Sequence, residues 1–196
     1  MKKIVLSNII TVFAILFFLA FSSPLYAGQI GPAIFQETYK TDNLELKLQG
    51  AGLKTFLAFK VVAAGLYLEE GVLPVDVLEN NSKRLEVVYL QPIRKKELQN
   101  ATTKGIKKNV SEEEFWQLSD RIEQINAYYP DVQPQDRIEI TYDPEIGTTV
   151  SVNGQYKGTI EGKDFARAFF AIWVGDRPVD RDIKLSLLGY KNNERF

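Results

Sequence analysis

Apolar and polar residues alternate along several stretches of the chain, which is typical of strands with one buried face. In residues 43–50, three leucines occupy alternate positions. Residues 56–68 form a longer, largely apolar run, and residues 84–92 form another that Pro92 ends. Residues 137–143 alternate again, so this strand is predicted to keep one face in water.

The dipeptide Asn153-Gly154 predicts a β-hairpin around it, because both residues accept the positive φ angles of a type I′ turn. With a plain two-residue turn, Val150 would pair with Lys157, and the apolar side of one strand would meet the polar side of the other. A bulge near Gly158 would restore the match, so we expect one there.

Three longer segments have helical periodicity. Residues 94–108 carry five lysines, most of them away from the apolar face. Both a solvated face and a surface for an anionic partner fit this pattern. Ser111 and Glu114 form a capping box at the start of a second helix. Residues 163–174 are apolar nearly all round, which is typical of a helix that is buried or lines an apolar cavity.

A short helix over residues 180–188 completes the order of elements: strands, two helices, strands, two helices. This order predicts one α+β domain, a large antiparallel sheet covered on one face by helices. Residues 28–42 are expected to lead into a domain that spans residues 43–189, and residues 190–196 form a polar tail.

The first 27 residues have the layout of a secretory signal peptide. Two lysines precede an apolar stretch over residues 4–21, and Ala27 follows Pro24 where cleavage is expected. Cleavage after Ala27 would place the protein in the periplasm or outside the cell. The apolar stretch is also long enough to cross a bilayer, so an uncleaved anchor is the alternative. We expect membrane contact only through this segment, if it is not cleaved.

Composition excludes several classes of site. The chain contains neither histidine nor cysteine, so Ser-His-Asp and Cys-His arrangements and His or Cys zinc sites are excluded. Proton transfer would need Lys, Tyr, Asp or Glu with a shifted pKa. No cofactor and no metal are expected. Residues 1–27 hold two of the 24 basic residues and none of the 25 acids, so residues 28–196 carry a net charge of −3, and nucleic acid is not an expected partner.

Four motifs in order along the chain carry a family resemblance. They are GAGLKTFLAFKVVAAGLYLE, YDPEIGTTVSVNG, GTIEGKDFARAFFAIWVG and DRDIKLSLLG. Together they resemble the chalcone isomerase-like family, especially its secreted bacterial members, over about residues 43–189. The family's fold is a large antiparallel sheet covered by helices, with an apolar ligand cavity between the layers. The resemblance implies the same cavity here.

The family includes isomerases that close a hydroxylated chalcone into a flavanone and non-catalytic members that bind fatty acids. The catalytic positions of the isomerases correspond here to Lys54, Val62, Leu98, Gly105, Ile172 and Trp173. None of the isomerase residue types is retained, so the resemblance implies that this chain is not a chalcone isomerase. Fatty-acid-binding members hold the carboxylate with an arginine and a tyrosine at about the positions of Lys54 and Val62.

Lys54, which follows two closely spaced glycines, at positions 50 and 52, has two interpretations. It is a solvated turn lysine, or it is a cation that meets an anionic ligand at a cavity entrance. Lysine keeps the charge of arginine but loses its planar fork. Tyr67 and Tyr89 are either core tyrosines or sources of a replacement hydroxyl. The expected ligand-binding residues are Lys54, Val62, Tyr67, Tyr89, Phe169, Ile172 and Trp173.

The favoured hypothesis is a periplasmic, non-catalytic protein that binds a fatty acid or a similar amphipathic ligand between sheet and helices. One alternative is an intramolecular lyase or isomerase of unknown substrate. The other is an interaction protein that has kept the fold and lost the ligand. The ligand-binding hypothesis fails if the side chains of Phe169, Phe170 and Trp173 fill the cavity. Whether an open cavity remains between sheet and helices therefore distinguishes a ligand-binding protein from an interaction protein.

Overall fold

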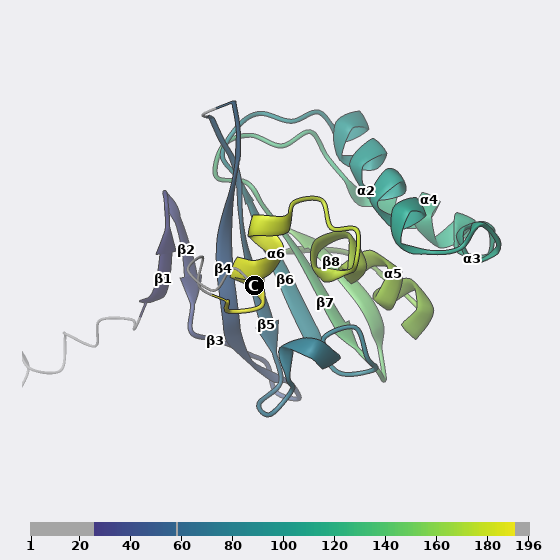
Figure 1. Ribbon diagram of the computed structural model, residues 1–196, viewed down its shortest axis with the longest axis horizontal. Coiled ribbons are helices and arrows are strands. Elements are labelled where there is room, and N and C mark those ends of the chain that lie inside the picture. The colour runs from purple at the N-terminus through teal and green to yellow at the C-terminus, as the bar shows by residue number, and fades with distance from the viewer. Residues whose placement is uncertain (1–25, 58, 191–196) are drawn as a thin grey trace, which may run out of the picture.

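The computed structural model describes residues 26–57 and 59–190 (Figure 1). Its central feature is a seven-stranded antiparallel sheet in which strands adjacent in the chain are also adjacent in the sheet, in the order β3-β4-β5-β6-β7-β8-β9. These strands are β3 (Thr38–Lys40), β4 (Glu45–Phe56), β5 (Phe59–Leu68), β6 (Lys83–Tyr89), β7 (Arg137–Asp143), β8 (Gly147–Val152) and β9 (Gln155–Ile160). The predicted α+β fold class is confirmed.

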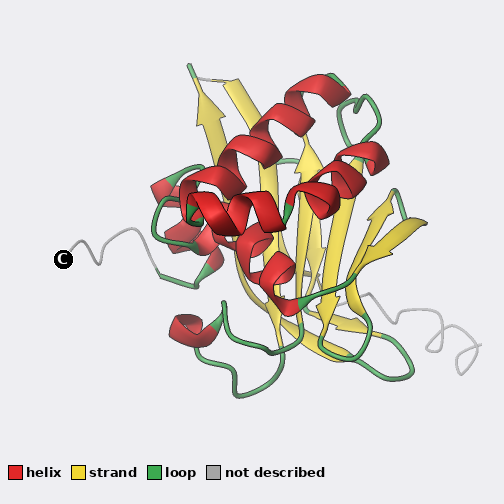
Figure 2. Cartoon of the chain, turned by 90° about the vertical axis from the view of Figure 1, so that its right-hand side faces the viewer, coloured by secondary structure: helices red, strands yellow, loops and turns green. Residues whose placement is uncertain are grey.

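The helices lie together over one face of the sheet (Figure 2). They are α2 (Lys95–Asn109), α3 (Glu112–Gln117), α4 (Ser119–Tyr128), α5 (Lys163–Val174) and α6 (Arg181–Leu187), and a 3₁₀ turn, η1 (Pro74–Asp76), follows β5. Alternate residues of β5, β6 and β7 pack with α2, α4 and α5 into the main hydrophobic core. The helix α5 is buried on most of its surface, as its all-round apolar pattern predicts.

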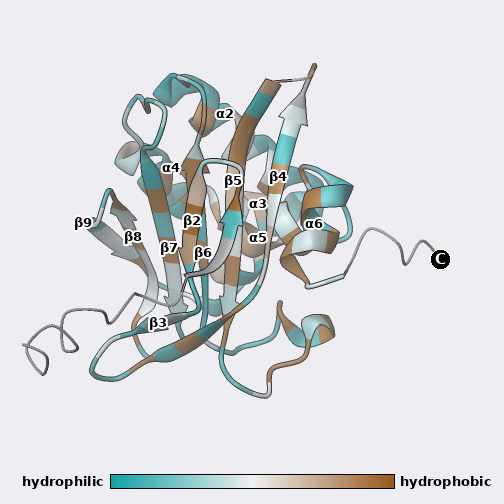
Figure 3. Cartoon of the chain, turned by 90° about the vertical axis from the view of Figure 1, so that its left-hand side faces the viewer, coloured by the Kyte–Doolittle hydropathy of each residue, from teal (hydrophilic) through white to brown (hydrophobic). Residues whose placement is uncertain are grey.

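A two-stranded hairpin, β1 (Tyr26–Ile30) and β2 (Ala33–Gln36), covers part of the opposite face of the sheet (Figure 3). Phe35 is fully buried there against Gly65 of β5, where a Cβ atom would come within 2.7 Å of the Phe35 ring. The segment expected only to lead into the fold therefore contributes two strands and a second small core, and β3 besides.

The prediction that β7 keeps one face in water is wrong for Glu139, which is only 6% exposed. Its neighbours on this face are charged and interact with one another: Arg84 Nε donates to Glu86 Oε1 at 2.9 Å, and Arg137 pairs with the same carboxylate. Arg137 also donates to the Ile34 carbonyl at 2.8 Å, which ties the sheet to the N-terminal hairpin. Burial raises the pKa of Glu139.

Helix α6 packs directly on β4 because Gly50 and Gly52 leave room for it. A Cβ at Gly50 would lie 2.2 Å from the Ser186 carbonyl oxygen, and one at Gly52 would lie 2.7 Å from Ser186 Cβ. The sheet register also shifts between Leu48 and Gly50. The two glycines therefore lie within one continuous strand, at a bulge, and β4 extends past the expected strand end at residue 50.

The predicted hairpin at Asn153-Gly154 is confirmed, with φ angles of 51° and 75° at these two residues. Val150 pairs with Gly158, and the register shifts between Val150 and Ser151, so the expected bulge is also present. This shift keeps the apolar side of β9 facing the core.

The single helix expected after Ser111 is two helices, because the chain breaks its regular geometry at Leu118. The Ser111 hydroxyl accepts from the Glu114 backbone N–H at 3.2 Å, as a cap should. The Glu114 carboxylate does not return a bond to the Ser111 backbone but pairs with Arg167 of α5, so only half of the predicted capping box forms and Glu114 links two helices.

The predicted signal segment lies outside the described residues, apart from its last two residues, which begin β1. Residues 191–196 of the polar tail also lie outside them. Within residues 26–57 and 59–190, none of the helices combines the length and apolar character needed to cross a bilayer.

Candidate functional site

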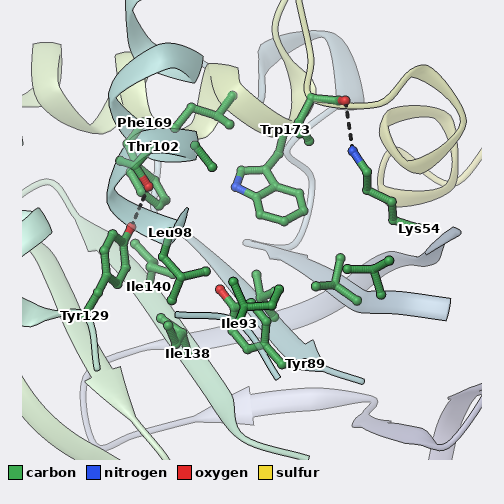
Figure 4. Close-up of a pocket in the computed structure, with 16 residues that line it drawn as sticks. Lys54, Tyr89, Ile93, Leu98, Thr102, Tyr129, Ile138, Ile140, Phe169 and Trp173 are labelled. Atoms are coloured by element: carbon green, nitrogen blue, oxygen red, sulfur yellow. Dashed lines mark hydrogen bonds between the residues drawn. The ribbon is translucent and has the colours of Figure 1, made fainter. Parts of the chain in front are cut away.

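A pocket of about 190 Å³ lies between the sheet and helices α2 and α5 (Figure 4). Most of its wall is aliphatic or aromatic. The described residues that line it are Lys54, Val61, Val62, Val87, Tyr89, Ile93, Leu98, Ala101, Thr102, Tyr129, Ile138, Ile140, Phe169, Ile172, Trp173 and Val179.

The floor of the pocket comes from three neighbouring strands. Val62 of β5 is paired with Tyr89 of β6, and Val87 of β6 is paired with Ile138 of β7. Because paired residues of an antiparallel sheet point to the same face, this register gathers their side chains beneath the helices. The result is a continuous apolar floor to which Tyr89 adds one hydroxyl.

The roof of the pocket comes from α2 and α5. Leu98 and Thr102 lie one turn apart on α2. The Trp173 ring of α5 points into the pocket, toward Tyr89 (Figure 4). The two helices approach closely at Gly105, where a Cβ would lie 2.8 Å from Ile172 Cγ2. A glycine at this point of α2 therefore sets how near α5 can come to it.

Lys54 lies at the edge of the pocket, opposite its cross-strand partner Val62. The Lys54 ammonium donates to the Val179 carbonyl at 3.2 Å, which ties β4 to the loop after α5 (Figure 4). Val179 is itself exposed, so this edge opens to solvent. An ammonium has three N–H donors, and the bond to Val179 uses one of them. Lys54 is the only charged residue among the described residues of the pocket wall.

Two hydroxyl groups form a buried pair at the other side of the pocket. The Thr102 and Tyr129 hydroxyls lie 2.9 Å apart. Burial raises the pKa of Tyr129 to about 12, although the bond to Thr102 lowers it in part. Burial also raises the pKa of Tyr89, with a further contribution from nearby Tyr129. Both phenols therefore stay protonated at neutral pH, so they can donate hydrogen bonds to a ligand but cannot act as bases.

The structure brings six of the seven expected ligand-binding residues to this pocket: Lys54, Val62, Tyr89, Phe169, Ile172 and Trp173. Tyr67 is the exception. It lies on β5 five residues after Val62, so its side chain points to the opposite face of the sheet, where it is 1% exposed. Tyr67 interacts there with the backbone of Gln36 in the N-terminal hairpin, so it is not a ligand contact of this pocket.

Residue-by-residue reasoning missed Thr102 and Tyr129. Thr102 lies one helical turn after Leu98, so helical spacing from Leu98 could have indicated it. Nothing local indicates that Tyr129, 27 positions away, meets Thr102. The aromatic residues of α5 line the space without filling it, since the pocket persists beside Phe169 and Trp173.

A comparison with family models decides the family. The chalcone isomerase-like model matches residues 27–189. This chain belongs to the chalcone isomerase-like family. The match begins 16 residues before the expected domain start at residue 43, and so it includes the N-terminal hairpin and β3.

Among solved structures, this chalcone isomerase-like protein is similar to the Arabidopsis thaliana fatty-acid binding protein AtFAP1. The two are 14% identical with a TM-score of 0.65, and the match covers 82% of this chain and 95% of that one. At this identity, the likeness shows the fold. No curated protein sequence matches the chain.

The chemistry available in the pocket is limited. It offers one cation, three hydroxyl groups and the Trp173 indole N–H in an apolar wall, and no carboxylate among the described lining residues. Such a set can hold an anionic or polar head and bury an apolar body. Among the described residues, no group of three or more Asp or Glu side chains is placed to hold a metal ion.

Proposed function

We propose that this protein binds a small amphipathic carboxylate, such as a fatty acid, in the pocket and does not transform it. One observation carries the proposal: among the described residues that line the apolar pocket between sheet and helices, Lys54 alone is charged, and it lies at the open edge. In this arrangement the carboxylate pairs with the Lys54 ammonium, and the acyl chain lies over Val62 and Tyr89 beneath Trp173. The family membership and the fold shared with a fatty-acid binding protein support it.

The volume of the pocket limits the length of the acyl chain that it can hold. Its volume of about 190 Å³ is below the roughly 300–1,000 Å³ of typical ligand pockets. We therefore propose a short- or medium-chain acid as the preferred ligand. The layout of residues 1–27, which is that of a signal peptide, supports a periplasmic location, so the protein would bind these acids outside the cytoplasm.

Two features favour binding over catalysis. The pocket phenols, Tyr89 and Tyr129, stay protonated at neutral pH, and no carboxylate lines the described wall. Apart from Lys54, which the proposal assigns to the ligand carboxylate, the described wall therefore offers donors that hold a ligand and no group to remove a proton from it. At the position where the isomerases use a threonine, this family member has Val62.

Native mass spectrometry of the protein purified from a bacterial periplasm tests the proposal, with Lys54→Ala beside wild type. We expect the wild type to carry a co-purified mass of fatty-acid size, or to take up added fatty acids from a series of 6 to 16 carbons. Binding should be about tenfold or more weaker in Lys54→Ala, because a charge-assisted hydrogen bond contributes about 1.5–3 kcal/mol.

Lys60→Ala is the matched control, because Lys60 lies on the same hairpin, is exposed and does not line the pocket. It should bind the same acids as the wild type. A clean unliganded mass for every protein, with no uptake of any acid, would refute the proposal and favour the interaction protein. Equal binding by Lys54→Ala would show that the carboxylate does not meet Lys54.

A further inference from the structure

The turn between β4 and β5 exposes two large apolar side chains to solvent. Leu57 is 78% exposed and Phe59 is 67% exposed. Leu57 also has a φ of 46°, a region that favours glycine or asparagine over leucine. The β8–β9 hairpin of the same sheet meets that demand with Asn153-Gly154. Leucine at the β4–β5 turn thus suits neither the turn geometry nor the core, and its exposure points to a contact outside the chain.

The charges around this turn are positive. Residues 53–61 contain two lysines, Lys54 and Lys60, and no acid. Lys60 is exposed directly beside Phe59, and Gln91 donates to its carbonyl at 3.4 Å from the β6–α2 connection. Apolar side chains bordered by lysines match a bilayer with anionic headgroups, which accepts the apolar groups at the headgroup boundary and attracts the ammonium groups.

Helix α2 begins at the same end of the sheet as this turn (Figure 1). Its first two residues, Lys95 and Lys96, are exposed lysines. Glu97 pairs with Arg94 at 3.0 Å, and the Asp131 carboxylate accepts from the Lys95 backbone N–H at 2.7 Å, so the three cations at residues 94–96 exceed these two carboxylates by one charge. The start of α2 thus extends the positive charge beside the apolar turn.

We propose that the β4–β5 turn docks this protein on an anionic membrane surface, with Leu57 and Phe59 in the headgroup region and Lys60 against the lipid phosphates. Docking does not depend on the proposed function and goes beyond it, and it replaces the expectation that only residues 1–27 contact a membrane. Because Lys54 and Val61 of the same hairpin line the pocket, docking would also bring the open edge of the pocket next to the bilayer.

The absence of cysteine from the chain allows a local test with single labels. Leu57→Cys carries an environment-sensitive dye at the turn. Leu73→Cys carries the same dye in the β5–β6 connection, which lies at the opposite end of β5 and exposes Leu73 and Val75 to a similar degree. The two full-length proteins have the same N-terminus, so membrane contact by residues 1–27 cannot by itself distinguish the two labels.

Each labelled protein is mixed with vesicles of phosphatidylcholine alone or with 30% phosphatidylglycerol, at low and at high salt. We expect a blue shift at position 57 with the anionic vesicles, weakened at least fivefold by Lys60→Glu or by high salt, and no shift at position 73. Docking is wrong if the label at 57 stays in water on anionic vesicles or if both labels shift alike. A concentration-dependent shift at 57 without vesicles would instead assign the turn to a second copy of the chain.

Discussion

Lys54 and Val62 face each other across β4 and β5, and both side chains line the same pocket. Lys54 offers a carboxylate ligand a positive charge, whereas Val62 has methyl groups where a hydroxyl would add a hydrogen bond to the same carboxylate. The pair makes the edge of the pocket capable of attracting an anion, while leaving one hydrogen bond unmade.

Val62→Thr should tighten binding of a carboxylate ligand about tenfold, because it adds a hydroxyl to the pocket at the position paired with Lys54, at nearly constant volume. The same hydroxyl lacks a partner in the empty pocket, so the free energy of unfolding should fall by about 1–3 kcal/mol. Titration calorimetry with decanoate and urea unfolding measure the two effects. Val87→Thr, on the floor away from Lys54, should be destabilised without binding better. An equal increase in affinity in both variants would show that the ligand carboxylate does not bind near Lys54.

Thr102→Val should lower the free energy of unfolding by about 1–3 kcal/mol, because the buried Tyr129 hydroxyl loses its partner at 2.9 Å. Urea unfolding of Thr102→Val, Tyr129→Phe and the double variant measures the coupling. We expect the double variant to lose less than the sum of the single losses, since removing both hydroxyls leaves neither unpaired. Strict additivity would mean that the two hydroxyls do not stabilise each other.

Gly50→Ala should destabilise the protein by about 3 kcal/mol or more, because the added Cβ would meet the Ser186 carbonyl at 2.2 Å. Hydrogen exchange should then show that α6 loses protection from solvent. Gly71→Ala is the control: its φ is 89° but nothing lies within 4 Å of the new Cβ. That variant should lose about 1–2 kcal/mol through backbone strain alone, with α6 still protected. Unchanged protection of α6 in Gly50→Ala would contradict the close packing of α6 on β4.

Lys83 should make stability depend on pH above neutrality. Its ammonium donates to the Glu79 carbonyl at 2.6 Å and lies 5.1 Å from the centre of the Tyr142 ring. Burial lowers the pKa of Lys83 from 10.5 to about 8. Between these values the unfolded chain holds a proton that the folded chain has released, so the contribution of Lys83 to stability rises as pH increases from about 8 to 10.5.

Lys83→Met removes this contribution. Below pH 8 the wild type holds a charged, poorly hydrated ammonium, so Lys83→Met should be the more stable protein there. The difference in free energy of unfolding between the two proteins should then shrink as pH rises toward 10.5. Urea unfolding from pH 6 to 10 measures it. A difference that stays constant over this range would show that Lys83 does not titrate there.

Local patterns were sufficient for most strands and helices, and they failed where the chain is short or broken. The first three strands were missed because each has only three to five residues, too few for alternation to show. The break at Leu118 was missed because apolar residues keep helical spacing across it, from Phe115 to Ile122. Val62 and Tyr67 are five residues apart, and an odd spacing puts two side chains on opposite faces of a strand. The alternation of the strand was therefore sufficient to exclude one of the two from the pocket, although both were predicted to bind the ligand.

Periodicity and composition are properties of neighbouring residues, so they indicate the α+β class, the turn at Asn153-Gly154 and the absence of any histidine or cysteine chemistry. The site depends on distant residues. The meeting of Thr102 with Tyr129, the burial of Glu139 beside Arg84 and Arg137, and the bond from Lys54 to Val179 arise only when the layers pack. The volume of the pocket is set in the same way, because it is the small difference between the space the backbone encloses and the side chains that fill it.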